Sequence, residues 1–154
     1  MTITWLLVKV SASGGQLYLL MIHGKMAEGM LDSCKLFFGD GIEKVKALCL
    51  NPDDAPEQYD IRIKEAIKEI DDGSGIVAMC DLLGGTPSNR SMYCINDRFQ
   101  VITGINFTML LELLGRRINA EDVNELDIDE LMEIGRKGIV NLTQKFQEVQ
   151  DEDF

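Results

Sequence analysis

Residues 76–89 have the sequence IVAMCDLLGGTPSN, and the rest of the chain is best understood from this stretch. The run Ile76–Cys80 is wholly apolar, which is typical of a strand that is buried on both faces of a sheet. Asp81 ends that run, and Gly84 and Gly85 follow as a turn that lets the backbone come close to a ligand. The stretch therefore predicts a strand, an acidic residue, a glycine turn and then a helix.

The helix after the glycine turn is expected to begin at Pro87, with Thr86 as its N-cap. In an open α/β sheet, ligands bind at the carboxyl ends of the strands, and the N–H groups at a helix start suit an anion. An ordinary strand-to-helix turn would use the same residues, so the motif alone leaves both interpretations open.

On either side of this stretch, three more apolar runs have the composition of buried strands. They are Leu17–Ile22, Val45–Leu50 and Phe99–Ile105. Helices are expected at Lys25–Phe38, Pro56–Ile70, Pro87–Ile95 and Phe107–Leu114, with another from near Asp127. Strands that alternate with helices predict right-handed βαβ units. The expected fold is therefore α/β and doubly wound, with a mostly parallel central sheet and helices on both faces.

The two ends of the chain are expected to lie outside its one domain, which we place at residues 17–147. Residues 1–16 form an extension of unclear role. Within it, the strand-like run Thr2–Val10 suits an added edge strand, a hairpin partner or an extension from an upstream start. Residues 148–154 are expected to be a solvated acidic tail. Gly138–Thr143 predicts either a last strand or the end of the preceding helix.

Charge and cysteine content exclude several classes of function. A net charge of −11 disfavours non-specific binding to nucleic acid or to an anionic membrane. The four cysteines form no C-x-x-C pair and the chain has one histidine, so we expect no metal site. Buried free thiols in a reducing cytosol account for these cysteines. No apolar stretch approaches the roughly 20 residues that span a bilayer, so we expect no membrane-spanning helix. No positive region precedes the N-terminal apolar run, which disfavours a signal peptide.

Two of the expected strands end on side chains that can carry chemistry. His23 follows the first core strand and Asp81 follows the third, so a parallel sheet brings both to its carboxyl edge. A carboxylate beside a histidine fixes one ring nitrogen as a donor and leaves the other as a nucleophile. The N–H groups of Gly84–Asn89 would hold an anion next to that nucleophile. This combination suits phosphoryl transfer onto nitrogen.

Two other interpretations of His23 stay open on the residues alone. A histidine at a strand end can simply cap the next helix, and this interpretation is about as favourable as the catalytic one. A Ser-His-Asp hydrolase would also use a histidine and an acid. The chain has no G-x-S-x-G elbow, however, and its histidine comes directly after the first core strand rather than last.

Three separated motifs, LLMIHGKMAEGML, VAMCDLLGGTPSN and VITGINFTMLLELL, resemble one known family in their order and spacing. That family is the enzyme IIA domain of the mannose/fructose/sorbose group of the bacterial sugar phosphotransferase system, and the resemblance covers about residues 17–143. The family's motif residues fall on His23, Gly24, Asp81, Gly84, Gly85, Thr86, Pro87, Asn89, Gly104, Asn106 and Met109.

The resemblance implies a phosphoryl carrier that needs no metal or cofactor. His23 would accept a phosphoryl group on Nε2 from the carrier protein HPr and would pass it to enzyme IIB during phosphoenolpyruvate-dependent sugar uptake. Asp81 would hold His23 through Nδ1. The phosphate-binding residues would be Gly24, Gly84, Gly85, Thr86 and Ser88.

The resemblance also implies a cytoplasmic homodimer, with a C-terminal strand exchanged or paired between the copies. Gly138–Thr143 is the candidate for that strand. Enzyme IIB is expected to be a separate protein, and the membrane is reached only through the transporter subunits. Some family members carry an aromatic residue where this chain has Leu83, so partner contacts are expected to differ.

Two alternative functions share this site. One is the phosphotransferase subunit of a dihydroxyacetone kinase. The other is a regulatory module that senses phosphorylation through His23. The transported sugar is not encoded in a IIA domain, because enzyme IIB and the membrane subunits set it.

Three further groups of residues have more than one possible role. The apolar face of the helix at Phe107–Leu114 predicts core packing or a dimer interface. Arg116 and Arg117 are expected to be solvated, with docking of a phosphorylated partner as the alternative. Met26 and Met30 are candidates for a partner surface near His23, and at least one of them is expected to pack in the core.

Overall fold

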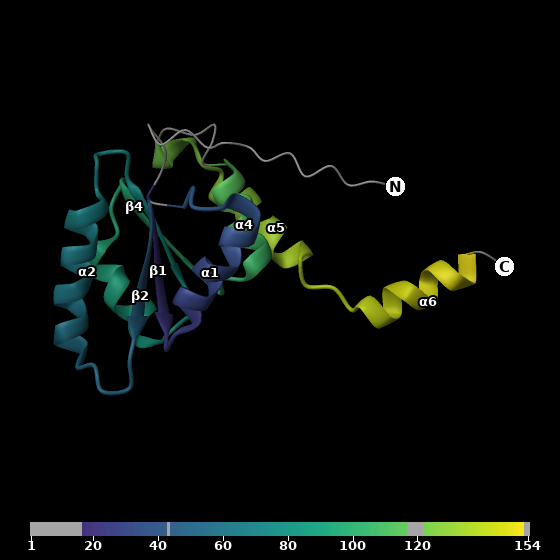
Figure 1. Cartoon of the computed structure of the whole chain (residues 1–154), viewed down its shortest axis with the longest axis horizontal. Helices are drawn as coiled ribbons and strands as arrows, with labels where there is room; N and C mark the ends of the chain where they lie inside the picture. The colour runs from purple at the N-terminus through teal and green to yellow at the C-terminus, as the bar shows by residue number, and fades with distance from the viewer. Residues whose placement is uncertain (1–16, 43, 117–121, 153–154) are drawn as a thin grey trace.

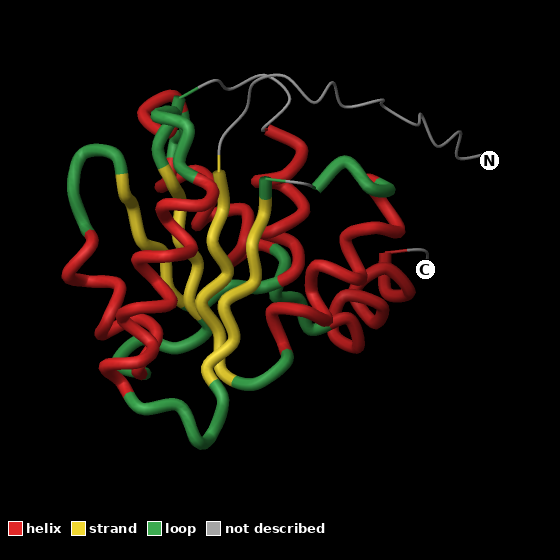
Figure 2. Tube along the Cα trace, turned by 60° about the vertical axis from the view of Figure 1, so that its left-hand side comes forward, coloured by secondary structure: helices red, strands yellow, loops and turns green. Residues whose placement is uncertain are grey.

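A parallel four-stranded sheet forms the centre of the computed structural model, which describes residues 17–42, 44–116 and 122–152. The strands are β1 (Leu17–His23), β2 (Val45–Leu50), β3 (Ile76–Cys80) and β4 (Phe99–Thr103), and their spatial order is β2-β1-β3-β4. Figure 2 shows these strands in yellow, side by side in one twisted sheet. The expected doubly wound α/β sheet is confirmed.

Helices cover both faces of this sheet (Figure 1). One face carries α1 (Met26–Phe38), α4 (Phe107–Arg116) and α5 (Ile128–Lys137). The other face carries α2 (Pro56–Ile70) and α3 (Thr86–Ser91), with a 3₁₀ turn over Met92–Cys94 after α3. A second 3₁₀ turn, Val123–Glu125, precedes α5.

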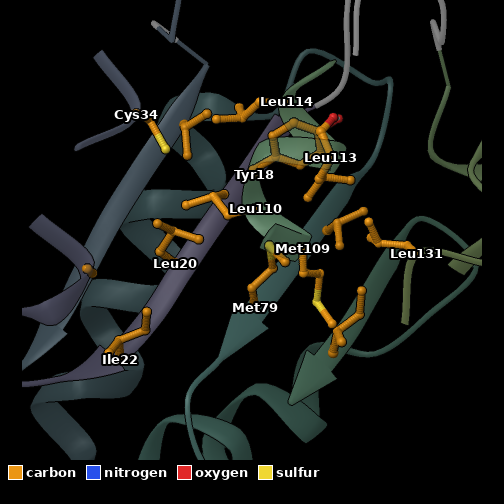
Figure 3. Close-up of a cluster of buried hydrophobic side chains, with 14 of the residues drawn as sticks. Tyr18, Leu20, Ile22, Cys34, Met79, Met109, Leu110, Leu113, Leu114 and Leu131 are labelled. Atoms are coloured by element: carbon orange, nitrogen blue, oxygen red, sulfur yellow. The ribbon is translucent and has the colours of Figure 1, made fainter. Parts of the chain in front are cut away.

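Because side chains alternate along each strand, every strand supplies both cores. Tyr18, Leu20 and Ile22 of β1 pack beneath α1 and α4, in the cluster drawn in Figure 3. Leu17, Leu19 and Met21 pack on the opposite side, beneath α2. Both faces of β1 are therefore dry, as an unbroken apolar run predicts. The apolar face of α4 is also confirmed as core, since all four of its members are buried: Met109, Leu110, Leu113 and Leu114.

Three predicted element boundaries were wrong: the start of α3, the end of α3 and the end of β4. Gly85, not Thr86, is the N-cap of α3, and Thr86 is its first helical residue. The helix expected to reach Ile95 ends at Ser91 and tightens into the 3₁₀ turn. Strand β4 ends at Thr103 because Gly104 has φ of +78°, a conformation that leaves the strand.

The C-terminal part also differs from expectation. Gly138 forms the turn that ends α5, residues 139–141 have no regular secondary structure, and a helix that the sequence did not predict, α6 (Leu142–Glu152), follows them. Within the described chain, Gly138–Thr143 is thus neither a strand nor a continuation of α5, whose cap is Gly138. Figure 1 shows α6 pointing away from the body of the domain. The predicted tail at 148–154 is helical as far as Glu152, and Thr2–Val10 lies outside the described residues.

No described helix is both long enough and apolar enough to cross a membrane. Within the same residues, no group of three or more His, Cys, Asp or Glu side chains is placed to hold a metal ion. Cys34, Cys49 and Cys80 are buried free thiols, as predicted, and Cys94 is half-buried.

Candidate functional site

The structure brings His23 and Asp81 together at the carboxyl edge of the sheet. Strands β1 and β3 are neighbours, and Met21 pairs with Cys80, so His23 at the end of β1 and Asp81 directly after β3 lie at the same edge of the sheet. Nδ1 of His23 lies 3.0 Å from Oδ1 and 2.9 Å from Oδ2 of Asp81. The backbone N–H of His23 also donates to Oδ2, at 3.2 Å. The predicted pair is therefore in direct contact.

This contact fixes the form of the His23 ring. A carboxylate can only accept hydrogen bonds, so this contact selects the neutral tautomer that has its proton on Nδ1 and its lone pair on Nε2. The N–H of Leu82 donates to Oδ1 of Asp81 at 3.0 Å, which holds the carboxylate from a second side. The Asp81 side chain is 12% exposed and that of His23 is 38% exposed. Asp81, itself held by hydrogen bonds, thus orients the ring of His23, whose side chain is partly exposed to solvent.

Gly85 lies directly against the His23 ring. A Cβ atom at this position would stand 2.6 Å from Cε1 and 3.2 Å from Nε2 of His23, closer than real side chains pack. The residue must therefore be glycine because of space, since its φ of −74° is one that any residue adopts. The backbone of the glycine turn forms one side of the site.

A pocket of about 360 Å³ opens beside the histidine. Its lining combines the end of β1, the loop after β2 and the starts of α2 and α3. The lining residues are His23, Gly24, Leu50, Asn51, Pro52, Asp54, Pro56 and Thr86. The pocket is large enough for a small group and lies beside the His23 side chain.

The predicted phosphate-binding residues divide into two groups. Gly24 and Thr86 line the pocket, and Gly85 contacts the ring. Ser88 is buried, and its hydroxyl donates to the carbonyl of Gly85 at 3.0 Å. The Gly84 carbonyl accepts from the Asn89 side chain at 3.0 Å. Ser88 and Asn89 thus hold the shape of the glycine turn with their side chains.

Sequence reasoning missed the part of the pocket lining that the loop after β2 supplies. The sequence indicates only a polar loop at Asn51–Ala55, yet Asn51, Pro52 and Asp54 line the site. Oδ2 of Asp54 accepts from the Asn51 N–H at 2.8 Å and from Arg62 Nη1 at 2.6 Å. The Asn51 N–H, with further help from Arg62, holds the pKa of Asp54 below its usual value. The polar sequence N-P-D-D directly after a core strand was the one sequence signal that could have placed this loop in the site.

The structure shows the surroundings of the methionines and of one of the two arginines whose roles the sequence left open. Met26, the first residue of α1, is exposed, and Met30 packs against the core. Arg116 donates to Glu112 and to Glu130, both at 2.7 Å, and these bonds raise its pKa. It is therefore engaged within the domain, whereas Arg117 lies outside the described residues.

Comparison with known proteins gives a consistent result. A family model described as "PTS system fructose IIA component" matches residues 18–130. The "PTS system mannose-specific EIIAB component" of Escherichia coli (strain K12) is 28% identical over 125 residues, which cover 80% of this chain and 38% of that protein. The chain thus spans well under half the length of the curated relatives it matches.

Two solved structures share the fold. Phosphotransferase system component EIIA from Streptococcus agalactiae aligns with a TM-score of 0.74 at 26% identity, over 83% of this chain and 98% of that one. The mannose/sorbose specific IIA subunit of the phosphotransferase system from Enterococcus faecalis aligns with a TM-score of 0.72 at 26% identity, over 82% and 94% of the two chains.

Proposed function

The chain belongs to the mannose/fructose family of phosphotransferase-system IIA components, and from that premise we propose that it is a phosphoryl carrier acting through His23. It accepts a phosphoryl group from phospho-HPr on Nε2 and passes it to enzyme IIB during phosphoenolpyruvate-dependent sugar uptake. The observation that carries this proposal is the contact between Nδ1 of His23 and the Asp81 carboxylate, which leaves Nε2 free.

The transfer needs only groups that the site contains. The Nε2 lone pair attacks phosphorus, the bond from phosphorus to the donor histidine breaks, and the donor ring leaves with that electron pair. Positive charge then develops on the His23 ring, because Nδ1 keeps its proton. The Asp81 carboxylate, 2.9 Å from Nδ1, offsets this charge. The reverse steps pass the group to the next acceptor.

The phosphoryl oxygens are proposed to meet backbone N–H groups of the glycine turn. Thr86 and Ser88 belong to the first turn of α3, whose N–H groups have no acceptor within the helix. Gly24 and Thr86 line the pocket, and Gly84 and Gly85 shape the turn around the ring. Ser88 is assigned here through its N–H, because its hydroxyl is bonded to Gly85.

The proposed carrier domain spans residues 17–147 and acts as a homodimer in the cytoplasm. Buried thiols suit a reducing compartment. Several apolar side chains between α5 and α6 and on α6 are exposed in the single chain, which supports a second copy as their cover. They are Ile139, Val140, Leu142 and Phe146.

The relatives favour this role over the alternatives. They are sugar phosphotransferase components, which disfavours the phosphotransferase subunit of a dihydroxyacetone kinase. A hydrolase would release phosphate without an acceptor protein, and a regulatory module would keep its label in the presence of enzyme IIB. Loss of label on addition of enzyme IIB therefore separates the carrier from the regulatory module.

The proposal is tested by incubating the protein with phosphoenolpyruvate, enzyme I and HPr, and measuring the intact mass. The wild type should gain one acid-labile phosphate, and His23→Ala should gain none. A folded wild type that stays unlabelled would overturn the proposal.

A further inference from the structure

An ion pair lies in the wall of the His23 pocket. Nη1 of Arg62, on α2, is 2.6 Å from Oδ2 of Asp54, and Asp54 lines the pocket. The other terminal nitrogen of Arg62 donates to the Cys49 carbonyl at 2.9 Å. The guanidinium is therefore held between the end of β2 and the loop that follows it.

Asp54 organises that loop. The backbone N–H of Asn51 and its side-chain amide both donate to Oδ2, at 2.8 Å and 3.2 Å. These donors and Arg62 lower the pKa of Asp54, so the carboxylate is ionised at neutral pH. Asp54 thus fixes the position of Asn51, another residue of the pocket lining.

An ionised carboxylate in this wall conflicts with the proposed function. A phosphoryl group on Nε2 brings negative charge into the same pocket, and the whole chain already carries a net charge of −11. Asp54 keeps 21% of its side chain exposed, so water weakens the repulsion between these negative charges without removing it. The paired cation removes this conflict while the carboxylate keeps its structural bonds.

We propose that Arg62 and Asp54 form a charge-compensated positioning pair: Asp54 fixes the loop that lines the pocket together with His23, and Arg62 cancels its charge so that the phosphoryl group can enter. This inference rests on the proposed function of His23. It adds two residues outside the His23–Asp81 pair that act through the electrostatic potential and the shape of the pocket.

The pair predicts opposite effects for its two members. Arg62→Gln leaves Asp54 as an uncompensated anion, so the initial rate of His23 phosphorylation should fall by roughly three- to tenfold. Asp54→Asn keeps an oxygen that can accept the hydrogen bonds of the loop and leaves the cation of Arg62 in the wall, so the rate should equal or exceed that of the wild type. The double variant restores neutrality and should fall between the two. Arg62→Lys keeps the charge and should recover most of the rate.

Two control variants separate this effect from lost stability and from net charge. Arg98 bridges the Asp122 carboxylate and the Gly73 carbonyl at the amino edge of the sheet, away from His23, so Arg98→Gln breaks bonds of the same kind elsewhere. Asp53 is exposed and precedes Asp54 but is not in the pocket lining. Asp53→Asn therefore changes the net charge alone. Both controls should behave as the wild type does.

The experiment measures initial phosphorylation rates with two donors, phospho-HPr and the small molecule phosphoramidate, alongside thermal denaturation. The pair acts on the phosphoryl group itself, so Arg62→Gln should be slow with both donors. Equal losses in both single variants, a loss in Arg98→Gln of the same size, or a defect confined to phospho-HPr would overturn the inference. Those results leave the proposed function intact, whereas an unlabelled wild type refutes the function itself.

Discussion

The carboxylate of Asp81 holds both the backbone N–H and the ring of His23. Its Oδ2 accepts the backbone N–H of His23 at 3.2 Å, and its two oxygens lie 3.0 Å and 2.9 Å from Nδ1 of the ring. One carboxylate therefore ties the end of β1 to the end of β3 and also sets the protonation of the ring. Position and chemistry are coupled at this contact.

Asp81→Asn tests that coupling. The amide keeps the shape of the side chain but loses the charge that offsets the cationic phosphorylated ring. We expect the rate of phosphorylation to fall about 100-fold, a typical cost for one lost electrostatic partner at a reacting group. The rate is measured by quenched-flow mass spectrometry, and circular dichroism monitors the fold. A folded variant with the wild-type rate would show that Asp81 does not assist transfer.

Gly85→Ala tests the packing of the glycine turn on the ring. The added methyl would stand 2.6 Å from Cε1 of His23, so the ring must move and phosphorylation should be largely lost. Gly29→Ala is the matched control, because this exposed glycine of α1 has open space around a Cβ atom. It should keep full activity and gain up to about 1 kcal/mol in stability. A Gly85→Ala protein with full activity would contradict the close approach of the turn to the ring.

The exposed C-terminal apolar residues predict self-association. In sedimentation velocity the wild type should run as a dimer, and the double variant Ile139→Ser, Leu142→Ser should run as a monomer. Leu36→Ser is the control, since Leu36 is an exposed leucine of α1 and is not part of this segment. A wild-type monomer at micromolar concentration would refute the proposed dimer.

The cysteines should resist alkylation in the native protein. Burial raises the pKa of Cys34 and of Cys80 to about 11, so their thiolates form only as the pH approaches that value. At pH 7.5, iodoacetamide should leave both unmodified over minutes, while the half-buried Cys94 reacts first. In denaturant all four should react. Rapid labelling of Cys34 in folded protein would show that α1 opens readily.

The sheet could be predicted well from the sequence because its strands are buried on both faces. Runs such as Ile76–Cys80 contain no polar residues, whereas the helices have a polar face as well as an apolar one. Parallel pairing of the strands then places His23 beside Asp81. The same logic could not assign Thr86. Gly85 is the N-cap because its backbone is extended, and it is a glycine because the ring of His23 leaves no room for a side chain there.

Local sequence patterns could not predict the features that depend on contacts between separate segments of the chain. The Arg62–Asp54 pair joins residues eight apart, across a loop and a helix turn, and neither position has a distinctive motif. Residues 138–143 have strand-like composition, yet they do not pair with the described sheet. A helix begins at Leu142 instead. Their conformation depends on what they pack against.

His23 is the only histidine in the chain, so its ring can be observed without interference from any other. Nitrogen-15 NMR of histidine-labelled protein, before and after incubation with phosphoenolpyruvate, enzyme I and HPr, identifies which ring nitrogen bears phosphorus. We predict phosphorus on Nε2, with Nδ1 protonated in both states. Phosphorus on Nδ1, or a ring that remains unmodified in folded protein, would contradict the proposed role of the His23–Asp81 pair.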